Sequence, residues 1–212
     1  MMIYELRQYT LAPGSAGDYL KKNETIGRKI RGDKYGKLEG YWVTEFGTLD
    51  RLVHLWEYED LNQRERLRLD LTQNEAWKRD YIPKIQFNLV GQKVDFLYPI
   101  AALTPPADAG NVYEMRWYQT RPGDANAFIG LLEGVAPLYQ RFVRQVGLLR
   151  TEPSRLSEVI QLSVYRSLDE RSEKLARLEQ EPEWQTFLQR ASPLLSRVTA
   201  SALRPAKFSP MQ

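Results

Sequence analysis

A single histidine, His54, is the side chain of this sequence best suited to acid–base chemistry. It lies in an alternating run in which His54, Trp56 and Tyr58 fall on one side of an extended strand. Its imidazole, with an ordinary pKa near neutrality, can act as a general base if an acceptor such as Glu5 orients it. The alternatives are a structural histidine bonded inside a sheet interface and a proximal haem ligand. A zinc site is disfavoured because there is no cysteine and no second histidine.

Acidic and basic residues recur two positions apart near the start of each half of the chain. The pairs are Glu5 with Arg7 and Glu114 with Arg116. One interpretation is a buried ion-pair network, in which the loss of one member leaves an uncompensated charge. The other is that Arg7 or Arg116 anchors the carboxylate or enolate of a ligand, which the planar guanidinium suits. Repetition of the pair favours the structural interpretation.

Tyrosines and tryptophans surround these charges, and they can either form a ligand pocket or fill a core. The sequence contains neither a glycine-rich phosphate-binding loop nor a nucleophile elbow. His54 is therefore the candidate catalytic residue, and no metal site or cofactor is predicted apart from the haem alternative. The candidate ligand-binding residues are Glu5, Arg7, Tyr9, Trp56, Tyr58, Arg116 and Tyr118.

The balance of charge and the lack of cysteine exclude several functional classes. Lys and Arg total 30 against 27 Asp and Glu, an excess too small to indicate a nucleic-acid-binding protein. Without cysteine there can be no thiolate nucleophile and no cysteine-ligated cluster. No apolar run approaches the roughly 20 residues that span a bilayer. A strand-like pattern begins at Ile3, which leaves no room for a signal peptide. We expect a cytoplasmic protein.

The elements that carry these residues are repeated along the chain. The run Tyr4-Glu5-Leu6-Arg7-Gln8-Tyr9 with Pro13-Gly14 returns as Tyr113-Glu114-Met115-Arg116-Trp117-Tyr118 with Pro122-Gly123, a constant offset of 113 − 4 = 109. A repeat of this length predicts two fused domains, 1–100 and 111–212, with a linker at 101–110.

Each half predicts strand–helix–strand–strand–helix–strand, the order of a ferredoxin-like unit. In the first half the expected strands are 3–9, 41–46, 51–58 and 93–98, and the short turn 47–50 makes the second and third of them an antiparallel hairpin. One helix is expected over 13–30, and another begins after Asp60 and breaks near Pro83. Asp60 with Gln63, and Ser167 with Glu170 in the second half, are expected to cap the later helix. Pro13 is expected in the first turn of its helix. An antiparallel sheet left bare on one face must bury that face, so we predict that the two halves form an α+β barrel. Exposed sheet edges predict a homo-oligomer.

The second half suggests which strand face meets the helices. Ile160, Leu162 and Val164 are apolar and suit the helix side, whereas Gln161 and Ser163 alternate with them. By this parity the candidate site residues should point away from the helices, into the space between the two sheets.

In its repeat and in the hairpin of strands 41–46 and 51–58, the chain resembles the NIPSNAP family of the dimeric α+β barrel superfamily. The resemblance rests on Tyr4-Glu5-x-Arg7-x-Tyr9 with Pro13-Gly14, Gly40-Tyr41-Trp42, Glu45-x-Gly47-x-Leu49, Val53-His54-Leu55-Trp56-Glu57-Tyr58 and Trp77. Gln161 and Ser163 replace His54 and Trp56 in the second half, so one half alone can carry the histidine.

Two functional classes follow from the resemblance. The superfamily includes cofactor-free monooxygenases, haem-dependent enzymes and stress-response binding proteins, and a shared fold does not transfer a reaction. The first expectation is a non-catalytic or small-molecule-binding α+β barrel protein. The alternative is a cofactor-independent monooxygenase-like or isomerase-like enzyme, acting on a small aromatic or enolisable substrate between the sheets.

Overall fold

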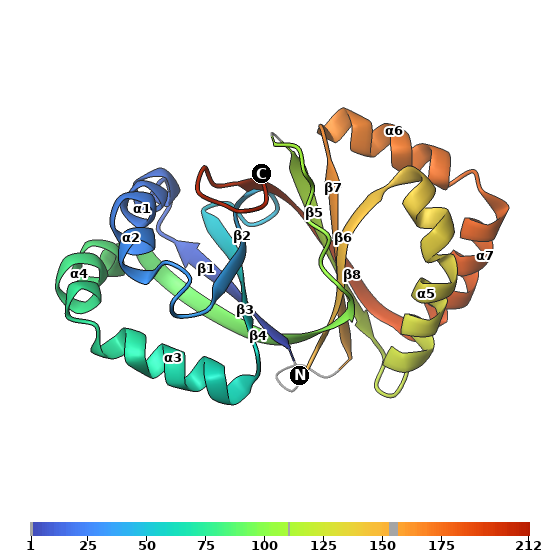
Figure 1. Ribbon diagram of the computed structural model, residues 1–212. Helices are drawn as coiled ribbons and strands as arrows, with labels where there is room; N and C mark the ends of the chain where they lie inside the picture. Colours follow the sequence, from blue (N-terminus) through green and yellow to red (C-terminus); the bar gives the residue numbers. More distant parts are fainter. Residues whose placement is uncertain (1, 110, 153–156) are drawn as a thin grey trace. The chain divides into compact units, whose positions relative to one another are not determined.

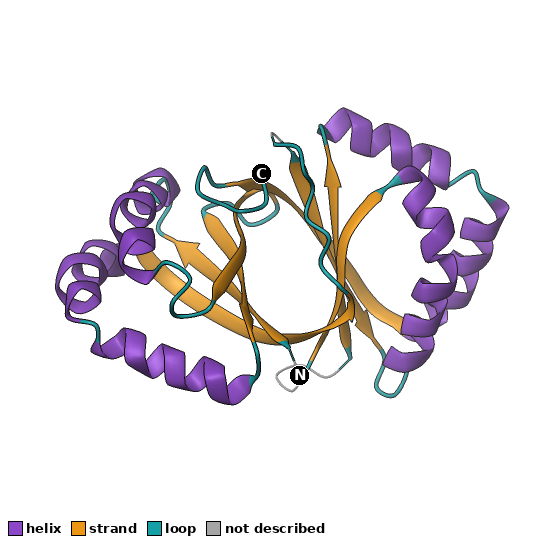
Figure 2. Ribbon diagram, viewed as in Figure 1, coloured by secondary structure: helices purple, strands orange, loops and turns teal. Residues whose placement is uncertain are grey.

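The computed structural model describes residues 2–109, 111–152 and 157–212, which form two compact units. Unit 1 consists of the residues up to Leu97 together with Arg204–Gln212, and unit 2 consists of Tyr98–Leu203. In each unit, helices cover one face of an antiparallel sheet (Figure 1, Figure 2). The mixed α+β class predicted from the sequence is confirmed.

Unit 1 contains a sheet in the order β4–β1–β3–β2, with every neighbouring pair antiparallel. The helical segments lie on one side of it (Figure 1). The strands are β1 (Ile3–Leu11), β2 (Lys37–Phe46), β3 (Arg51–Tyr58) and β4 (Leu89–Ala101), of which β4 ends in unit 2. The helical segments are α1 (Ala16–Lys22), η1 (Asn23–Gly27), α2 (Arg28–Arg31), α3 (Leu61–Gln73), η2 (Trp77–Tyr81), α4 (Ile82–Ile85) and η3 (Gln86–Asn88).

The first helix begins later than predicted, because Pro13 lies in the turn before it. Gly14 has φ 76°, which lies outside the helical region and which glycine adopts without a Cβ clash. The carboxylate of Asp50, in the β2–β3 turn, accepts hydrogen bonds from the backbone N–H of Gly14 at 2.9 Å and of Ala16 at 3.3 Å. The β2–β3 turn, whose hairpin was predicted, therefore fixes where α1 starts.

Two short π-helical turns interrupt the helices of unit 1. Segment η1 joins α1 to α2, and η2 follows the break at Asn74, nine residues before the break predicted at Pro83. Pro83 instead lies in the first turn of α4, a position where proline is tolerated. A Cβ at Gly27 would lie 2.7 Å from the ring of Tyr81, so glycine is what lets the two π turns approach.

The start of α3 carries the predicted cap. The carboxylate of Asp60 accepts from the N–H of Gln63 at 2.8 Å, and the Gln63 side chain accepts from the N–H of Glu59 at 2.8 Å. At the matching place in unit 2, the Ser167 hydroxyl accepts from the N–H of Glu170 at 3.1 Å.

Removal of these caps gives a first prediction. Asp60→Ala and Ser167→Ala should each lower the free energy of unfolding by about 1 kcal/mol, because a first-turn N–H loses its acceptor. Urea denaturation followed by circular dichroism measures the loss, and Asp60→Asn, which keeps an acceptor, is the control. A change in Asp60→Asn equal to that in Asp60→Ala would contradict the capping role.

Unit 2 repeats the arrangement with the strand order β8–β5–β7–β6, again antiparallel. Its strands are β5 (Val112–Thr120), β6 (Arg144–Thr151), β7 (Glu158–Tyr165) and β8 (Leu195–Pro205), of which β8 ends in unit 1. Its helices are α5 (Ala125–Phe142), α6 (Leu168–Leu178), α7 (Pro182–Ala191) and the 3₁₀ turn η4 (Ser192–Leu194). An apolar stripe of α5 is buried at Phe128, Leu132, Val135, Leu138 and Tyr139, where it packs with Trp184 and Phe187 of α7.

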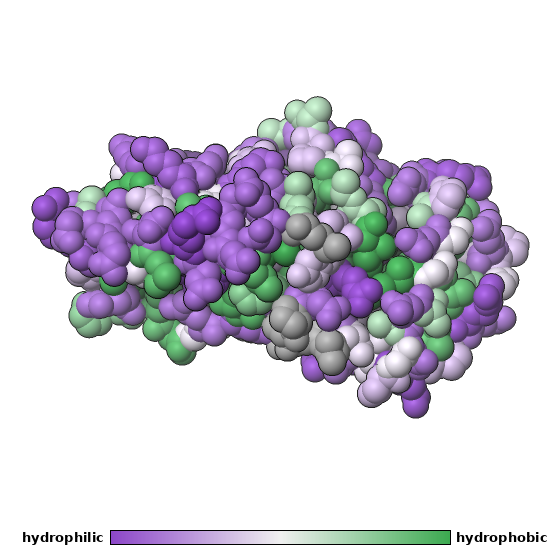
Figure 3. Space-filling view, turned by 60° about the horizontal axis from the view of Figure 1, so that its bottom comes forward, coloured by the Kyte–Doolittle hydropathy of each residue, from purple (hydrophilic) through white to green (hydrophobic). Residues whose placement is uncertain are grey.

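Hydrophilic side chains cover most of the face of the molecule drawn in Figure 3. The lysines of the first helical region contribute to this kind of surface, since Lys21, Lys29 and Lys34 are exposed. None of the helices in the described part of the chain combines the length and the apolar composition needed to cross a lipid bilayer.

Candidate functional site

Strand pairing brings the six candidate residues of unit 1 onto one face of its sheet. Arg7 pairs with His54, and Glu5 pairs with Trp56 across β1 and β3. On the other side of β3, Tyr41 pairs with His54. Tyr9 and Tyr58 continue the same face by alternation. The grouping by strand parity was therefore correct.

The side to which this face points was predicted wrongly. Tyr9 contacts Tyr19 of α1 edge-on, with ring centroids 6.4 Å apart, and Glu5 binds Arg64 of α3. The same holds in unit 2, where Tyr118 contacts Phe128 of α5. The candidate residues thus face the helices of their own unit, and not a space between sheets.

The error has a physical cause. The prediction assumed that helices offer only apolar contacts, so that an apolar strand face must meet them. Here the helices bring arginines and tyrosines that satisfy a polar strand face. The residues of the opposite faces are nonetheless buried and apolar, among them Tyr4, Leu6, Val53, Leu55, Met115, Ile160 and Leu162.

A cavity of about 180 Å³ lies between the sheet and helices of unit 1. We call it the arginine pocket, because four arginines line it and none of its described lining residues is acidic. Both π turns contribute to its wall, and π turns recur at functional sites. The lining residues are Arg7, Tyr9, Tyr19, Asn23, Gly27, Arg28, Arg31, Tyr41, His54, Trp56, Arg68, Trp77, Tyr81, Ile82, Ile85, Leu89 and Gln92.

His54 is held as a neutral hydrogen-bond donor. The indole N–H of Trp56 donates to its Nδ1 at 2.6 Å. Burial, and then the charges of Arg7, Arg31 and Arg68, hold the pKa of His54 well below its ordinary value. Because an indole can only donate, the proton of the neutral ring resides on Nε2. Nε2 is buried and has no hydrogen-bond partner among the described residues.

Tyrosines fix the plane of this imidazole. Tyr41 stacks on it with centroids 4.7 Å apart and an angle of 4° between the rings, while Tyr9 meets it edge-on at 4.7 Å. Tyr41 is itself held by the C-terminal segment, where Ser209 accepts from its N–H at 2.9 Å and Phe208 packs on its ring. His54 therefore has little freedom to turn.

Arg31 supplies the second buried donor of the pocket. Its guanidinium lies over the Trp56 ring, 3.2 Å from the centroid, and donates to the Tyr58 hydroxyl at 3.1 Å. Burial lowers the pKa of Arg31 to about 10, so it remains charged at neutral pH. Its Nε is buried without a partner in the described structure. Burial also lowers the pKa of Arg68.

Glu5 is neutralised by two arginines. One carboxylate oxygen accepts from Arg7 and the other accepts from Arg64 at 2.7 Å. Burial alone would raise the pKa of Glu5, but the hydrogen bond from Arg64 and the charge of Arg7 outweigh it and hold the pKa at about 2. The ion pair predicted from the sequence is present, but Glu5 does not orient His54.

Unit 2 has the same ion-pair arrangement without the histidine. Glu114 accepts from Arg116 and Arg171. Arg64 and Arg171 were missed as partners, although 171 − 64 = 107 equals the offset between the paired caps Ser167 and Asp60, 167 − 60. That shared offset could have revealed them.

The counterpart of His54 in unit 2 is hydrogen-bonded through both its side-chain oxygen and its side-chain nitrogen. Gln161 pairs with Arg116 in the sheet, accepts from the Tyr118 hydroxyl at 3.0 Å, and donates to Gln145 at 2.9 Å. Arg116 and Tyr118 thus belong to a different site from His54, and they line a separate cavity of about 500 Å³.

Comparison with known proteins identifies the family. The NIPSNAP family profile matches residues 4–103 and 113–210. The chain belongs to the NIPSNAP family. NipSnap homolog 3A of Homo sapiens is 26% identical over 218 residues, which cover 100% of this chain and 86% of that protein. NipSnap homolog 3B of Mus musculus is 27% identical over 220 residues, covering 99% and 85%.

A solved structure shares the fold of this chain. A protein of Fusobacterium nucleatum subsp. nucleatum, named "putative monooxygenase", superimposes with a TM-score of 0.72 at 13% identity, covering 97% of this chain and 93% of that one. An identity this low shows a shared fold and carries no reaction across.

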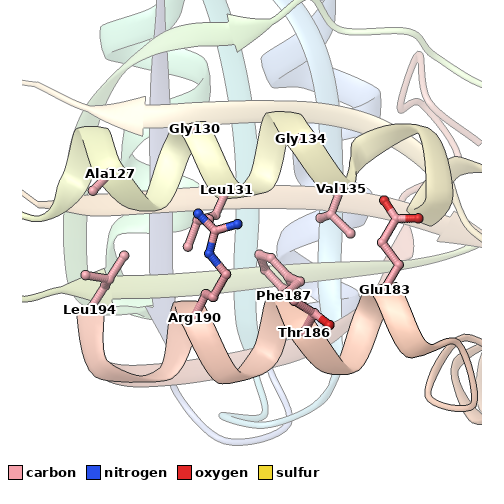
Figure 4. Close-up of a pocket in the computed structure, with 10 residues that line it drawn as sticks. All are labelled: Ala127, Gly130, Leu131, Gly134, Val135, Glu183, Thr186, Phe187, Arg190 and Leu194. Carbon is pink, nitrogen blue, oxygen red and sulfur yellow. The ribbon is translucent and has the colours of Figure 1, made fainter.

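The NIPSNAP chain has a further groove of about 710 Å³ between α5 and α7 of unit 2. Figure 4 shows Ala127, Gly130 and Gly134 along α5, with Phe187 and Arg190 of α7 on the other wall. The small residues leave room for the groove. Among the described residues that line this groove, none has a buried polar side-chain atom without a hydrogen-bond partner. The groove therefore offers no buried polar group to a ligand.

The residues around His54 do not fit the haem alternative. An axial histidine binds iron through an unprotonated ring nitrogen, whereas here Trp56 occupies Nδ1 and Nε2 carries the proton. Elsewhere in the described ranges, no three His, Cys, Asp or Glu side chains gather to hold a metal ion.

Proposed function

We propose that this NIPSNAP protein binds a small organic anion, such as an aromatic carboxylate or an enolate, in the arginine pocket of unit 1. The observation that carries the proposal is the buried Nε2–H of His54, which lacks a partner within the described structure and belongs to a residue that lines a cavity together with four arginines. A buried donor without an acceptor costs free energy, which an anionic ligand would recover.

The shape of the pocket narrows the ligand class. At about 30 Å³ per water molecule, 180 Å³ accommodates one small ring with a carboxylate. Tyr9, Tyr19, Tyr41 and Tyr81 offer ring faces and edges to such a ligand.

Binding is favoured over proton-transfer catalysis because none of the described residues in or beside the pocket is available as a base. Both oxygens of Glu5 accept from arginines. His54 Nε2 is already protonated. Burial raises the pKa of Tyr19 and Tyr41, so their hydroxyls remain neutral.

A second candidate is the monooxygenase-like or isomerase-like enzyme. One observation supports it: a neutral histidine donor beside a charged arginine is suited to stabilise an enolate oxygen. In that reaction the proton that the substrate loses on forming the enolate would have to be accepted by water. A ligand that binds and is recovered unchanged after incubation would favour the binding protein.

The finer architecture also remains a proposal. The strand orders of both units support two ferredoxin-like repeats. Their closure into one α+β barrel, the domain limits at 1–100 and 111–212, a homo-oligomer and a cytoplasmic location stay predictions from the sequence.

Benzoate is the probe that tests the binding function. Calorimetric titration should show benzoate binding to the intact protein, weakened about tenfold or more in His54→Phe and in Arg31→Gln, since each removes a hydrogen bond to a charged group. His54→Gln, which keeps a side-chain N–H, should retain more affinity than His54→Phe. Arg121→Gln, at an exposed position of unit 2 outside both cavities, is the matched control and should bind as the wild type does.

The proposal would be wrong if millimolar benzoate gave no heat and no shift in melting temperature. It would also be wrong if benzoate bound equally well to His54→Phe and Arg31→Gln. Inorganic phosphate serves as a second probe: if it binds more tightly than benzoate, the aromatic part of the ligand assignment fails.

A further inference from the structure

The cavity of about 500 Å³ in unit 2 differs in character from the arginine pocket. We call it the apolar pocket, because its walls are mainly hydrophobic. One arginine of the sheet, Arg116 of β5, also lines it. The residues that define it are Arg116, Phe128, Trp184, Phe187, Leu188 and Val198. None of the described residues that line it is acidic.

The two pockets occupy matching places in their units. Tyr9 pairs with Gln92 in the sheet of unit 1, and Tyr118 pairs with Val198 in that of unit 2. Gln92 therefore corresponds to Val198. Trp77 and Trp184, which line the respective pockets, differ by 184 − 77 = 107. The same fold position has two different linings.

The exchange of glutamine for valine changes the environment of the arginine. In unit 1 the Gln92 side-chain oxygen accepts from Arg7 Nη2 at 3.3 Å. A valine has no acceptor, so at Arg116 this polar contact is replaced by hydrophobic surface. Arg116 keeps its bond to Glu114, whose other oxygen is held by Arg171. The single negative charge of Glu114 is thus shared by Arg116 and Arg171, so the three side chains together carry a net positive charge beside the pocket.

We propose that the apolar pocket binds a monocarboxylate with an apolar tail. The carboxylate would lie on Arg116, whose planar guanidinium pairs with two oxygens at once. The tail would lie between Trp184, Phe187 and Leu188, and burial of its methylene groups stabilises the complex. This site is distinct from the arginine pocket and does not depend on it.

Octanoate tests the proposal in the intact protein. Calorimetric titration should show one octanoate site, with 1-octanol at least tenfold weaker because it lacks the charge. Arg116→Gln should weaken octanoate about tenfold or more. Since this change also removes a partner of Glu114, Val198→Gln is the second variant. Val198 is 49% exposed and tolerates a polar side chain. Its amide would accept from Arg116 and narrow the cavity, so octanoate should again weaken about tenfold.

His54→Phe in unit 1 is the control and should leave octanoate affinity unchanged. Loss of octanoate binding in His54→Phe would overturn the assignment to unit 2. Equal affinity for octanoate and 1-octanol would overturn the role of Arg116. Absence of octanoate binding, or unchanged binding in both Arg116→Gln and Val198→Gln, would overturn the site itself.

Discussion

Glu5→Gln is expected to lower the free energy of unfolding by about 3–5 kcal/mol, the usual cost of leaving a buried charge unpaired. Glu5 is completely buried, and it is the shared acceptor of Arg7 and Arg64. The amide keeps the shape of the side chain but removes the negative charge. Arg7 then lies in a pocket with Arg28, Arg31 and Arg68 and without its carboxylate.

Glu114→Gln is the matched control in unit 2. Its arginine partners are more exposed, with 17% and 31% of the side-chain surface of Arg116 and Arg171 accessible against 7% and 24% for Arg7 and Arg64. Water screens these charges better, so the loss should be smaller, roughly 1–3 kcal/mol. Urea denaturation at pH 7 compares the two variants. A loss below about 1 kcal/mol in Glu5→Gln, or a larger loss in Glu114→Gln, would contradict the argument.

For Glu5→Gln we expect the opposite effect on ligand binding. Without Glu5 the arginine pocket has a higher positive potential, so benzoate should bind more tightly to Glu5→Gln than to the wild type although the fold is less stable. The stability difference itself should narrow as the pH falls from 4.5 towards 2. The pKa of Glu5 is lowered from 4.5 to about 2 in the folded protein, so between these values the unfolded chain binds a proton that the folded carboxylate does not, and the stabilisation by the ion pair is lost.

Local sequence signals predicted much of the fold. The alternation of residues 51–58 gave strand β3 with its observed limits, and the spacing of Asp60 and Gln63 gave the cap of α3. These features depend on nearby residues alone. Other strand limits were less accurate, since β2 begins at Lys37 and β4 at Leu89, before the residues at which alternation becomes clear.

The site was harder to predict because it depends on contacts between elements distant in sequence. Parity correctly placed His54 with Arg7, but parity cannot tell which of two faces meets the helices. The decisive partners, Arg31 and Arg68, lie on helices whose polar residues look like solvent-exposed positions. The hydrogen bond from Trp56 to His54 reverses the role expected for the imidazole, from base to donor, and no spacing rule indicates its direction.

Acid should destabilise the wild type through His54, and this is the second large effect that we expect. The pKa of His54 lies well below 6.5 in the folded protein, owing to burial and the charges of three arginines. In the unfolded chain it returns to about 6.5. Below that value the unfolded state binds a proton that the folded state does not, so stability is complete above pH 6.5 and falls as the pH decreases.

The size of the effect follows from the slope of about 1.4 kcal/mol per pH unit. Between pH 7 and pH 5 the wild type should lose about 2 kcal/mol through this group alone. His54→Gln should not show this component, because the sequence contains no other histidine. The two proteins share every other titratable side chain, so the difference between the two pH profiles isolates His54.

Urea denaturation of both proteins at half-unit steps from pH 7 to pH 5 measures that difference. Parallel profiles would mean that the folded protein accepts a proton at His54 as readily as the unfolded chain does. An imidazole that accepts a proton so readily could not be enclosed among Arg7, Arg31 and Arg68 with Trp56 donating to Nδ1. The neutral Nε2–H donor, and with it the anion-binding role of the pocket, would then be untenable. Diverging profiles would show that His54 of the folded protein is a neutral donor in solution, without the need to know any ligand.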